Sequence, residues 1–150
     1  MPCEYKIFHN CNVIIKRYSG QVTTRCVLEL LDKIENDETF LEGMHEIDDL
    51  RFVTDFAIPE CDAKRLAELI KCINDRRKTP VKRAVVAFSE DIRSTARLNC
   101  AKIAESVDVD LRIFSEMKKA LEFMGILETP LADDLLQETL ETVNFSTDFS

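Results

Sequence analysis

Glycine and histidine are scarce in this sequence, and tryptophan is absent. The only glycines among the 150 residues are Gly20, Gly43 and Gly125, so neither common glycine-rich nucleotide-binding loop is present. The two histidines, His9 and His45, leave too little material for a zinc site or a histidine-dependent catalytic triad. We therefore predict that the chain holds no metal and no cofactor.

Long apolar runs are also lacking. The longest strongly apolar run covers residues 84–88, far short of the ~20 residues that a membrane-spanning helix needs. Residues 1–6 contain no apolar core of the kind found in secretory signals. These absences predict a cytoplasmic protein without a membrane span.

The sequence has six cysteines but no C-x-x-C pair. They are Cys3, Cys11, Cys26, Cys61, Cys72 and Cys100. In a cytosolic protein such thiols act as small apolar residues, so we expect them to stay reduced. We expect Cys3 and Cys11 to react first, because one lies near a terminus and the other in a turn.

The net charge of −8 argues against a nucleic-acid-binding protein. Residues 76–83 nevertheless hold five basic side chains. A solvated loop that complements the dipole of the preceding helix explains this run, and a patch for an anionic partner is the alternative.

Hydrophobic periodicity predicts an α/β fold. Residues 5–9 and 13–18 form an antiparallel hairpin, and further strands cover residues 45–50, 83–88 and 111–114. About four helices follow Thr23, Pro59, Ser89 and Ser115, and Gly125 ends the last of them. Strands separated by helices indicate a mixed, mostly parallel sheet.

Residues 126–150 differ in character from residues 1–125, because they carry six acidic side chains and no basic one. We therefore divide the chain into an α/β domain, 1–125, and an acidic C-terminal helix and tail, 126–150. A helix over about residues 132–143 would dock Leu135, Leu136 and Leu140 onto its own domain or onto a second subunit.

Two segments carry a family resemblance. The first is Ser19-Gly20-x-Val22-Thr23, and the second is Asp49-Leu50-Arg51-Phe52-Val53-Thr54-Asp55-Phe56. In this order of elements they resemble the SpoIIAA-like branch of the STAS domains over about residues 5–125. The resemblance implies a regulatory or binding role rather than catalysis, and related architecture occurs in the lipid-carrying CRAL-TRIO proteins.

The chain departs from that family at the phosphorylation site. Anti-sigma-factor antagonists of this fold carry a phosphorylatable serine directly after the aspartate at the mouth of the second helix. Here Asp55 is followed by Phe56 and Ala57, and Thr54 precedes it. We expect no kinase control through that position, while partner binding through the same surface stays open.

Candidate binding residues lie near the carboxyl ends of the predicted strands. Asp48 and Asp49 are adjacent on a strand and point to opposite faces, so they cannot form one acid–base pair. Asp49 and Asp55 both lie near the carboxyl end of a strand, and for both a capping role or pairing with Arg51 is commoner than catalysis. Arg93 and Arg97 lie four residues apart beside a buried helical stripe, where they could hold a phosphate or carboxylate near the carboxyl end of the strand at residues 84–88. Asp55 and Phe56 are further candidate ligand-binding residues.

The sequence therefore predicts a non-enzymatic, cytoplasmic regulatory module that binds an unidentified regulatory protein and forms a homodimer. The alternative is a carrier or sensor of an anionic small molecule or lipid, held by Arg93 and Arg97. A deep apolar cavity beneath the second and third helices would favour the carrier. A filled core with an exposed apolar patch would favour the partner-binding module.

Overall fold

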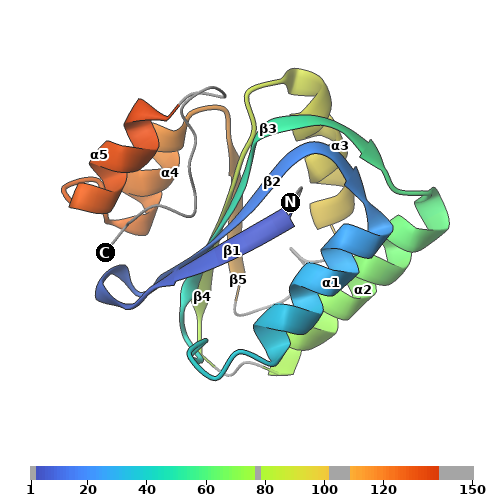
Figure 1. Ribbon diagram of the computed structural model, residues 1–150, viewed down its shortest axis with the longest axis horizontal. Coiled ribbons are helices and arrows are strands. Elements are labelled where there is room, and N and C mark those ends of the chain that lie inside the picture. The colour runs from blue at the N-terminus through green and yellow to red at the C-terminus, as the bar shows by residue number, and fades with distance from the viewer. Residues whose placement is uncertain (1–2, 77–78, 102–108, 139–150) are drawn as a thin grey trace.

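The computed structural model describes residues 3–76, 79–101 and 109–138 (Figure 1). Within them a five-stranded sheet is covered by helices on both faces. The strands are β1 (Cys3–Phe8), β2 (Val13–Thr23), β3 (His45–Ala57), β4 (Val81–Val86) and β5 (Val109–Phe114). The helices are α1 (Thr24–Glu35), α2 (Glu60–Arg76), α3 (Glu90–Cys100), α4 (Met117–Met124) and α5 (Pro130–Gln137), and a short 3-10 turn, η1 (His9–Cys11), joins β1 to β2.

The sheet follows the chain in the order β1-β2-β3-β4-β5. Strands β1 and β2 pair antiparallel, and every other neighbouring pair is parallel. Helices α1, α2 and α3 cross over on one face, and α4 and α5 cover the other (Figure 1). The predicted α/β class, mixed sheet and N-terminal hairpin are confirmed.

Strands β2 and β3 are much longer than the sequence predicts. Residues 19–23 continue β2 and pair in parallel with residues 52–57 of β3. Gly20, with φ of +61°, lies at a register shift and lets β2 bend without ending. Asp55 consequently lies on a strand, and α2 begins at Glu60, after Pro59.

The helix ends largely follow the predicted capping residues. Thr23 Oγ1 accepts a hydrogen bond from Cys26 N at 3.2 Å, and Ser89 Oγ accepts one from Ile92 N at 3.1 Å. Gly125 ends α4 with φ of +74°. The cap predicted at Ser115 is wrong, because the extended residue before α4 is Glu116, whose side chain makes no capping bond.

Each face of the sheet has its own hydrophobic core. Ile14, Tyr18 and Val85 pack beneath α1, α2 and α3, whereas Ile15, Ile47 and Val86 pack beneath α4 and α5. Both faces of β4 are buried, as its nearly continuous apolar sequence predicts. Among the described residues, no helix combines the length and apolarity needed to cross a membrane.

Helix α5 docks within its own subunit. It begins at Pro130 after the Thr129 cap, and Leu131, Ala132 and Leu135 are buried against α4 and the sheet. Leu136 is 43% exposed, because it is turned about 100° from Leu135 on the helix. Leu136 therefore does not pack with Leu135 against its own domain, and its docking onto a second subunit stays a prediction. Leu140 lies outside the described residues.

All six cysteines are described, and all are free thiols. Cys3 is 7% exposed, and burial followed by its hydrogen bond to Cys26 raises the pKa of its thiol. This environment is the opposite of the reactive one predicted from its place near the terminus. Cys61 and Cys72 are the exposed thiols.

The neighbouring leucines of α5 allow a matched stability test. Leu135→Ala should lower the free energy of unfolding by about 2–5 kcal/mol, because a fully buried side chain is truncated. Leu136→Ala should change it by no more than about 0.5 kcal/mol, because this side chain is largely exposed. Urea unfolding monitored by circular dichroism measures both. Equal losses would show that α5 does not dock through Leu135.

Candidate functional site

Strand β3 extends beyond the end of its neighbour β4, which leaves a gap in the sheet beneath α2 and α3. Strand β4 pairs with β3 only over residues 46–49 of β3, whereas β3 continues to Ala57. Beside this gap lie a cavity of about 110 Å³ and an outer groove of about 940 Å³. The two adjoin, because Phe56, Ile58 and Asn99 line both.

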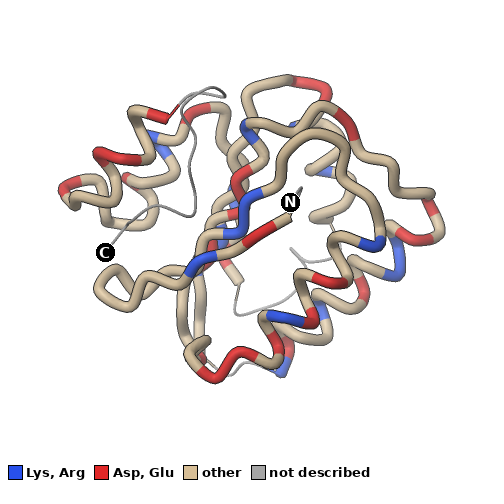
Figure 2. The backbone as a smooth tube through the Cα atoms, viewed as in Figure 1, with Lys and Arg blue, Asp and Glu red and all other residues tan. Residues whose placement is uncertain are grey.

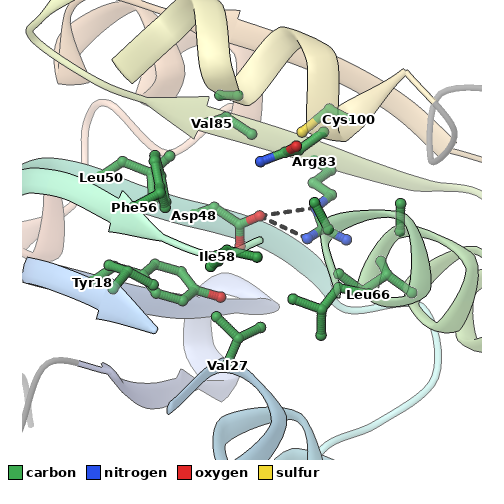
Figure 3. Close-up of a pocket in the computed structure, with 16 residues that line it drawn as sticks. Tyr18, Val27, Asp48, Leu50, Phe56, Ile58, Leu66, Arg83, Val85 and Cys100 are labelled. Atoms are coloured by element: carbon green, nitrogen blue, oxygen red, sulfur yellow. Dashed lines mark hydrogen bonds and ion pairs between the residues drawn. The ribbon is translucent and has the colours of Figure 1, made fainter. Parts of the chain in front are cut away.

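The cavity lies between the sheet and helices α1, α2 and α3 (Figure 3). Its apolar wall residues include Val22, Val27, Leu50, Phe56, Ile58 and Leu66. An apolar cavity of about 150 Å³ can hold one benzene ring, so this smaller space suits a small organic group rather than a lipid chain.

One end of the cavity is polar. The Tyr18 hydroxyl points inward, toward the side where Asp48 and Arg83 lie (Figure 3). Arg83 Nε and Nη2 donate hydrogen bonds to Asp48 Oδ2 at 3.0 and 2.7 Å. Burial, together with the Asp48 charge, holds the pKa of Tyr18 well above its usual value. The hydroxyl therefore stays protonated and is a hydrogen-bond donor at this end of the cavity.

Asp48 and Arg83 belong to a buried inner cluster with Lys16 and Glu46. Lys16 Nζ lies 3.4 Å from Glu46 Oε2 and 3.2 Å from Asp48 Oδ1, although its geometry toward Asp48 is not that of a hydrogen bond. Burial alone would lower the pKa of Arg83, but Asp48 and Glu46 raise it, so the guanidinium stays charged. With two cations and two carboxylates, the inner cluster is neutral overall.

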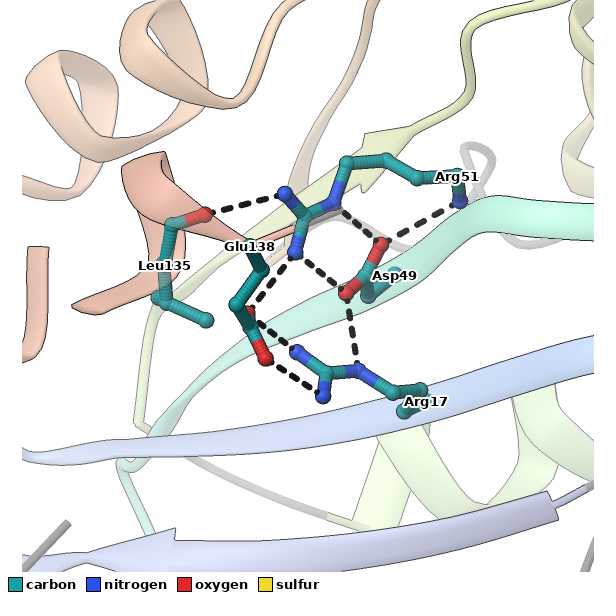
Figure 4. Close-up of polar contacts among 5 residues, drawn as sticks. All are labelled: Arg17, Asp49, Arg51, Leu135 and Glu138. Atoms are coloured by element: carbon teal, nitrogen blue, oxygen red, sulfur yellow. Dashed lines mark hydrogen bonds and ion pairs between the residues drawn. The ribbon is translucent and has the colours of Figure 1, made fainter. Parts of the chain in front are cut away.

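A second, outer cluster lies on the opposite face of the same strands and consists of Arg17, Asp49, Arg51 and Glu138 (Figure 4). Arg17 Nη1 and Nη2 donate to the two carboxylate oxygens of Glu138 at 2.9 and 2.7 Å. Arg51 Nε and Nη2 donate to those of Asp49 at 2.9 and 3.0 Å. The predicted pairing of Asp49 with Arg51, and the opposite orientation of Asp48 and Asp49, are confirmed.

The outer groove brings together Asp55, Phe56 and the exposed side of α3. Leu98 is 80% exposed, which makes it the most exposed large apolar side chain among the described residues. Among the described residues that line the groove, the charged ones are acidic except for Lys64. The acidic ones are Asp55, Glu60, Glu68 and Asp91. The groove therefore combines an apolar surface with a negative rim.

Arg93 and Arg97 line neither the groove nor the cavity. Arg93 Nη1 donates to the carbonyls of Ala87 and Phe88 at 2.9 and 2.7 Å. Both arginines also bond to Glu90, and these hydrogen bonds lower the pKa of Glu90 to about 2. The arginines lie near the end of β4 as predicted, but their donors are directed at this chain's own oxygens.

The basic run at residues 76–83 does not form one patch. Arg83 is buried on β4, and Lys82 Nζ donates to the carbonyl of Phe123 at 3.0 Å. Arg76 is exposed at the end of α2, and residues 77–78 lie outside the described ranges. The interpretation of residues 76–83 as a single surface patch for an anionic partner is therefore wrong, because the alternation of side chains along β4 turns Arg83 inward.

The buried charge pairing of Lys16, Arg17, Glu46 and Arg83 was not among the features predicted from the sequence. A signal was present: basic residues interrupt the apolar run of β2, and acidic residues interrupt that of β3. Figure 2 shows these charges close together along the central strands. Within the described ranges, no group of three or more His, Cys, Asp or Glu side chains is placed to hold a metal ion.

Comparison with known proteins identifies the fold. A solved structure of an uncharacterised DUF3478-family protein from Shewanella loihica PV-4, described as having a SpoIIAA-like fold, superposes with a TM-score of 0.55. The match has 9% sequence identity and covers 81% of this chain and 91% of that one. No protein-family model and no curated protein sequence matches this chain. The predicted SpoIIAA-like architecture is confirmed at the level of fold.

Glu138 should stabilise the whole fold through the outer cluster. Its side chain is 9% exposed, and Glu138→Ala would remove one carboxylate acceptor from the buried guanidinium groups of Arg17 and Arg51. We expect the free energy of unfolding to fall by about 3–5 kcal/mol. Glu128→Ala, which removes an exposed carboxylate between α4 and α5, should be nearly neutral. Chemical unfolding tests this, and similar small losses in both variants would contradict the prediction.

Proposed function

We propose that this chain is a non-enzymatic, cytoplasmic regulatory module that binds a basic, apolar segment of a partner protein in the groove between α2 and α3. The proposal rests on the exposed apolar surface of this groove and on the acidic residues that line it. Leu98 is 80% exposed, and Phe56 lines the deeper side of the groove. An exposed apolar surface rimmed by polar residues is typical of a protein-binding site.

Charge complementarity indicates the chemistry of the partner. Within the described part of the chain, four carboxylates and one ammonium group line the groove, so a cationic segment is attracted and an anionic one is repelled. An amphipathic helix with leucines on one face and lysines beside them fits this pattern. The predicted anionic ligand at Arg93 and Arg97 fits less well, because those donors already bond to Glu90 and to backbone carbonyls.

The chemistry of the site supports binding rather than catalysis. The carboxylates of the inner cluster are paired with Lys16 and Arg83. Burial raises the pKa of Cys100 to about 11 and also raises that of Tyr18, so both cavity groups hold their protons at neutral pH. Nucleophilic catalysis needs a nucleophile whose proton a nearby base removes. In the cavity the Tyr18 hydroxyl and the Cys100 thiol stay protonated, and the inner carboxylates are held in ion pairs with Lys16 and Arg83.

A second candidate function rests on the cavity itself. The inner cluster is neutral, and the Tyr18 hydroxyl offers a hydrogen bond beside apolar walls. A small uncharged molecule with one polar group, such as a phenol, matches this lining. The chain would then sense a small molecule at the position where the cavity adjoins the groove, rather than carry an anionic lipid.

Partner binding can be tested with two designed helical peptides of equal length. One pairs leucine with lysine, and the other pairs leucine with glutamate. We expect the basic peptide to bind, Leu98→Asp to weaken it at least about tenfold, and Leu41→Asp, at an exposed leucine that does not line the groove, to leave it unchanged. Fluorescence anisotropy measures the affinities. Equal binding of both peptides, or no effect of Leu98→Asp, would refute the proposal. Sedimentation of the protein alone tests the homodimer that the sequence predicts.

Ligand binding in the cavity can be tested with phenol and benzene as probes. We expect phenol to raise the melting temperature of the natural protein. The control variant Tyr5→Phe should respond equally, because the Tyr5 hydroxyl that it removes bonds to Asp37 outside the cavity. Tyr18→Phe should respond to phenol no more than to benzene, because it lacks the hydroxyl at the polar end of the cavity. Scanning fluorimetry reports each shift against the same unliganded variant. An undiminished phenol response in Tyr18→Phe would exclude the predicted hydrogen bond.

A further inference from the structure

Two thiols from distant parts of the sequence meet beside the cavity. Cys3 on β1 and Cys26 on α1 are 23 positions apart, and their sulfur atoms lie 2.7 Å from each other. Cys3 is buried and Cys26 is half-buried. No other two of the six cysteines form a hydrogen bond. We propose that Cys3 and Cys26 form an intrachain disulfide when the protein meets a peroxide.

Backbone contacts hold both sulfur atoms in place. Cys3 pairs with Tyr18 in the β1–β2 ladder. Cys26 lies in the first turn of α1, where Thr23 N donates to its Sγ at 3.3 Å and its own N–H donates to Thr23 Oγ1 at 3.2 Å. The sulfur atoms are only about 0.7 Å farther apart than in a disulfide bond. The two sulfur atoms therefore already lie close to bonding distance in the folded protein.

The reaction begins at Cys26, the more exposed of the two thiols. Its sulfur attacks one oxygen of hydrogen peroxide, the O–O bond breaks, and the leaving hydroxide takes up the thiol proton as water. Cys26 is then a sulfenic acid. The sulfur of Cys3 attacks that of Cys26, the S–O bond breaks, and the departing hydroxide takes the Cys3 proton as a second water. Two thiols are oxidised, and one peroxide is reduced.

The bond would tie the edge strand of the sheet to α1. The disulfide would lie directly beside the cavity wall. Tyr18 pairs with Cys3, Val27 follows Cys26, and both Tyr18 and Val27 line the cavity. Joining the two elements restricts the unfolded chain, and we expect the oxidised protein to melt about 5–10 °C higher than the reduced protein. The proposal does not depend on any ligand or partner.

The experiment treats the reduced, folded protein with hydrogen peroxide, blocks the remaining thiols with iodoacetamide under denaturing conditions, and maps the digest by mass spectrometry. We expect a linked peptide pair containing Cys3 and Cys26, with a mass lower by two hydrogen atoms than the sum of the free peptides. Recovery of both cysteines as alkylated thiols, or linkage of either one to a different cysteine, overturns the proposal.

Matched variants separate this pair from general thiol oxidation. Cys3→Ser should accumulate a sulfenic acid on Cys26 that dimedone traps, and it should lose the rise in melting temperature. Cys61→Ser, which removes an exposed thiol of α2, should form the same linked peptides as the natural sequence. An equal rise in melting temperature for oxidised Cys3→Ser would show that the stabilisation has another source. The peptide map of the natural sequence decides the question even if Cys3→Ser does not fold.

Discussion

Lys16 and Arg17 are consecutive residues of β2, so their side chains enter opposite hydrophobic layers of the molecule. Each cation must meet carboxylates there, because a buried charge without a partner costs several kcal/mol. Asp48 and Asp49, consecutive on β3, meet this need on the two faces. A shift of one residue between β2 and β3 would leave these charges unpaired in both cores, so the two clusters specify the parallel register of the central strands.

The same requirement extends beyond β2 and β3. Arg83 places β4 beside β3 through its two hydrogen bonds to Asp48. Glu138 anchors the end of α5 through Arg17 and Arg51, and Arg51 also donates to the carbonyl of Leu135 at 3.0 Å. Segments that are far apart in the sequence are thus joined by charge pairing as well as by apolar packing. Helices α4 and α5 complete one face as structural cover.

The opposite face is built differently and carries the candidate functions. Strand β3 extends beyond the end of β4, so α2 and α3 lie over an opening rather than over a continuous sheet. The inner cluster neutralises its own charges at the base of this opening, whereas the described residues that line the groove carry four carboxylates and one cation, Lys64. A neutral interior beneath an acidic entrance favours an uncharged group inside and a basic segment outside.

Much of the fold was predictable, because strand alternation, helix capping and apolar periodicity are local properties. They indicated the hairpin, the caps at Thr23 and Ser89, the end of α4 at Gly125 and the buried strand β4. They failed where distant residues decide the outcome. The continuation of β2 past Ser19-Gly20 depends on pairing with β3, which no local pattern of that segment reveals.

The candidate site was predictable only in part. Pairing of Asp49 with Arg51 follows from their spacing on one strand, and Asp55 and Phe56 do line the groove. The sequence by itself determined the α/β class, the order of the elements and which residues are charged. The tertiary structure alone decided which charges meet, since Arg83 reaches Asp48, Glu138 reaches Arg17, and Cys3 reaches Cys26 only after the strands have aligned. Contacts between residues so far apart depend on chain packing, which local sequence patterns do not encode.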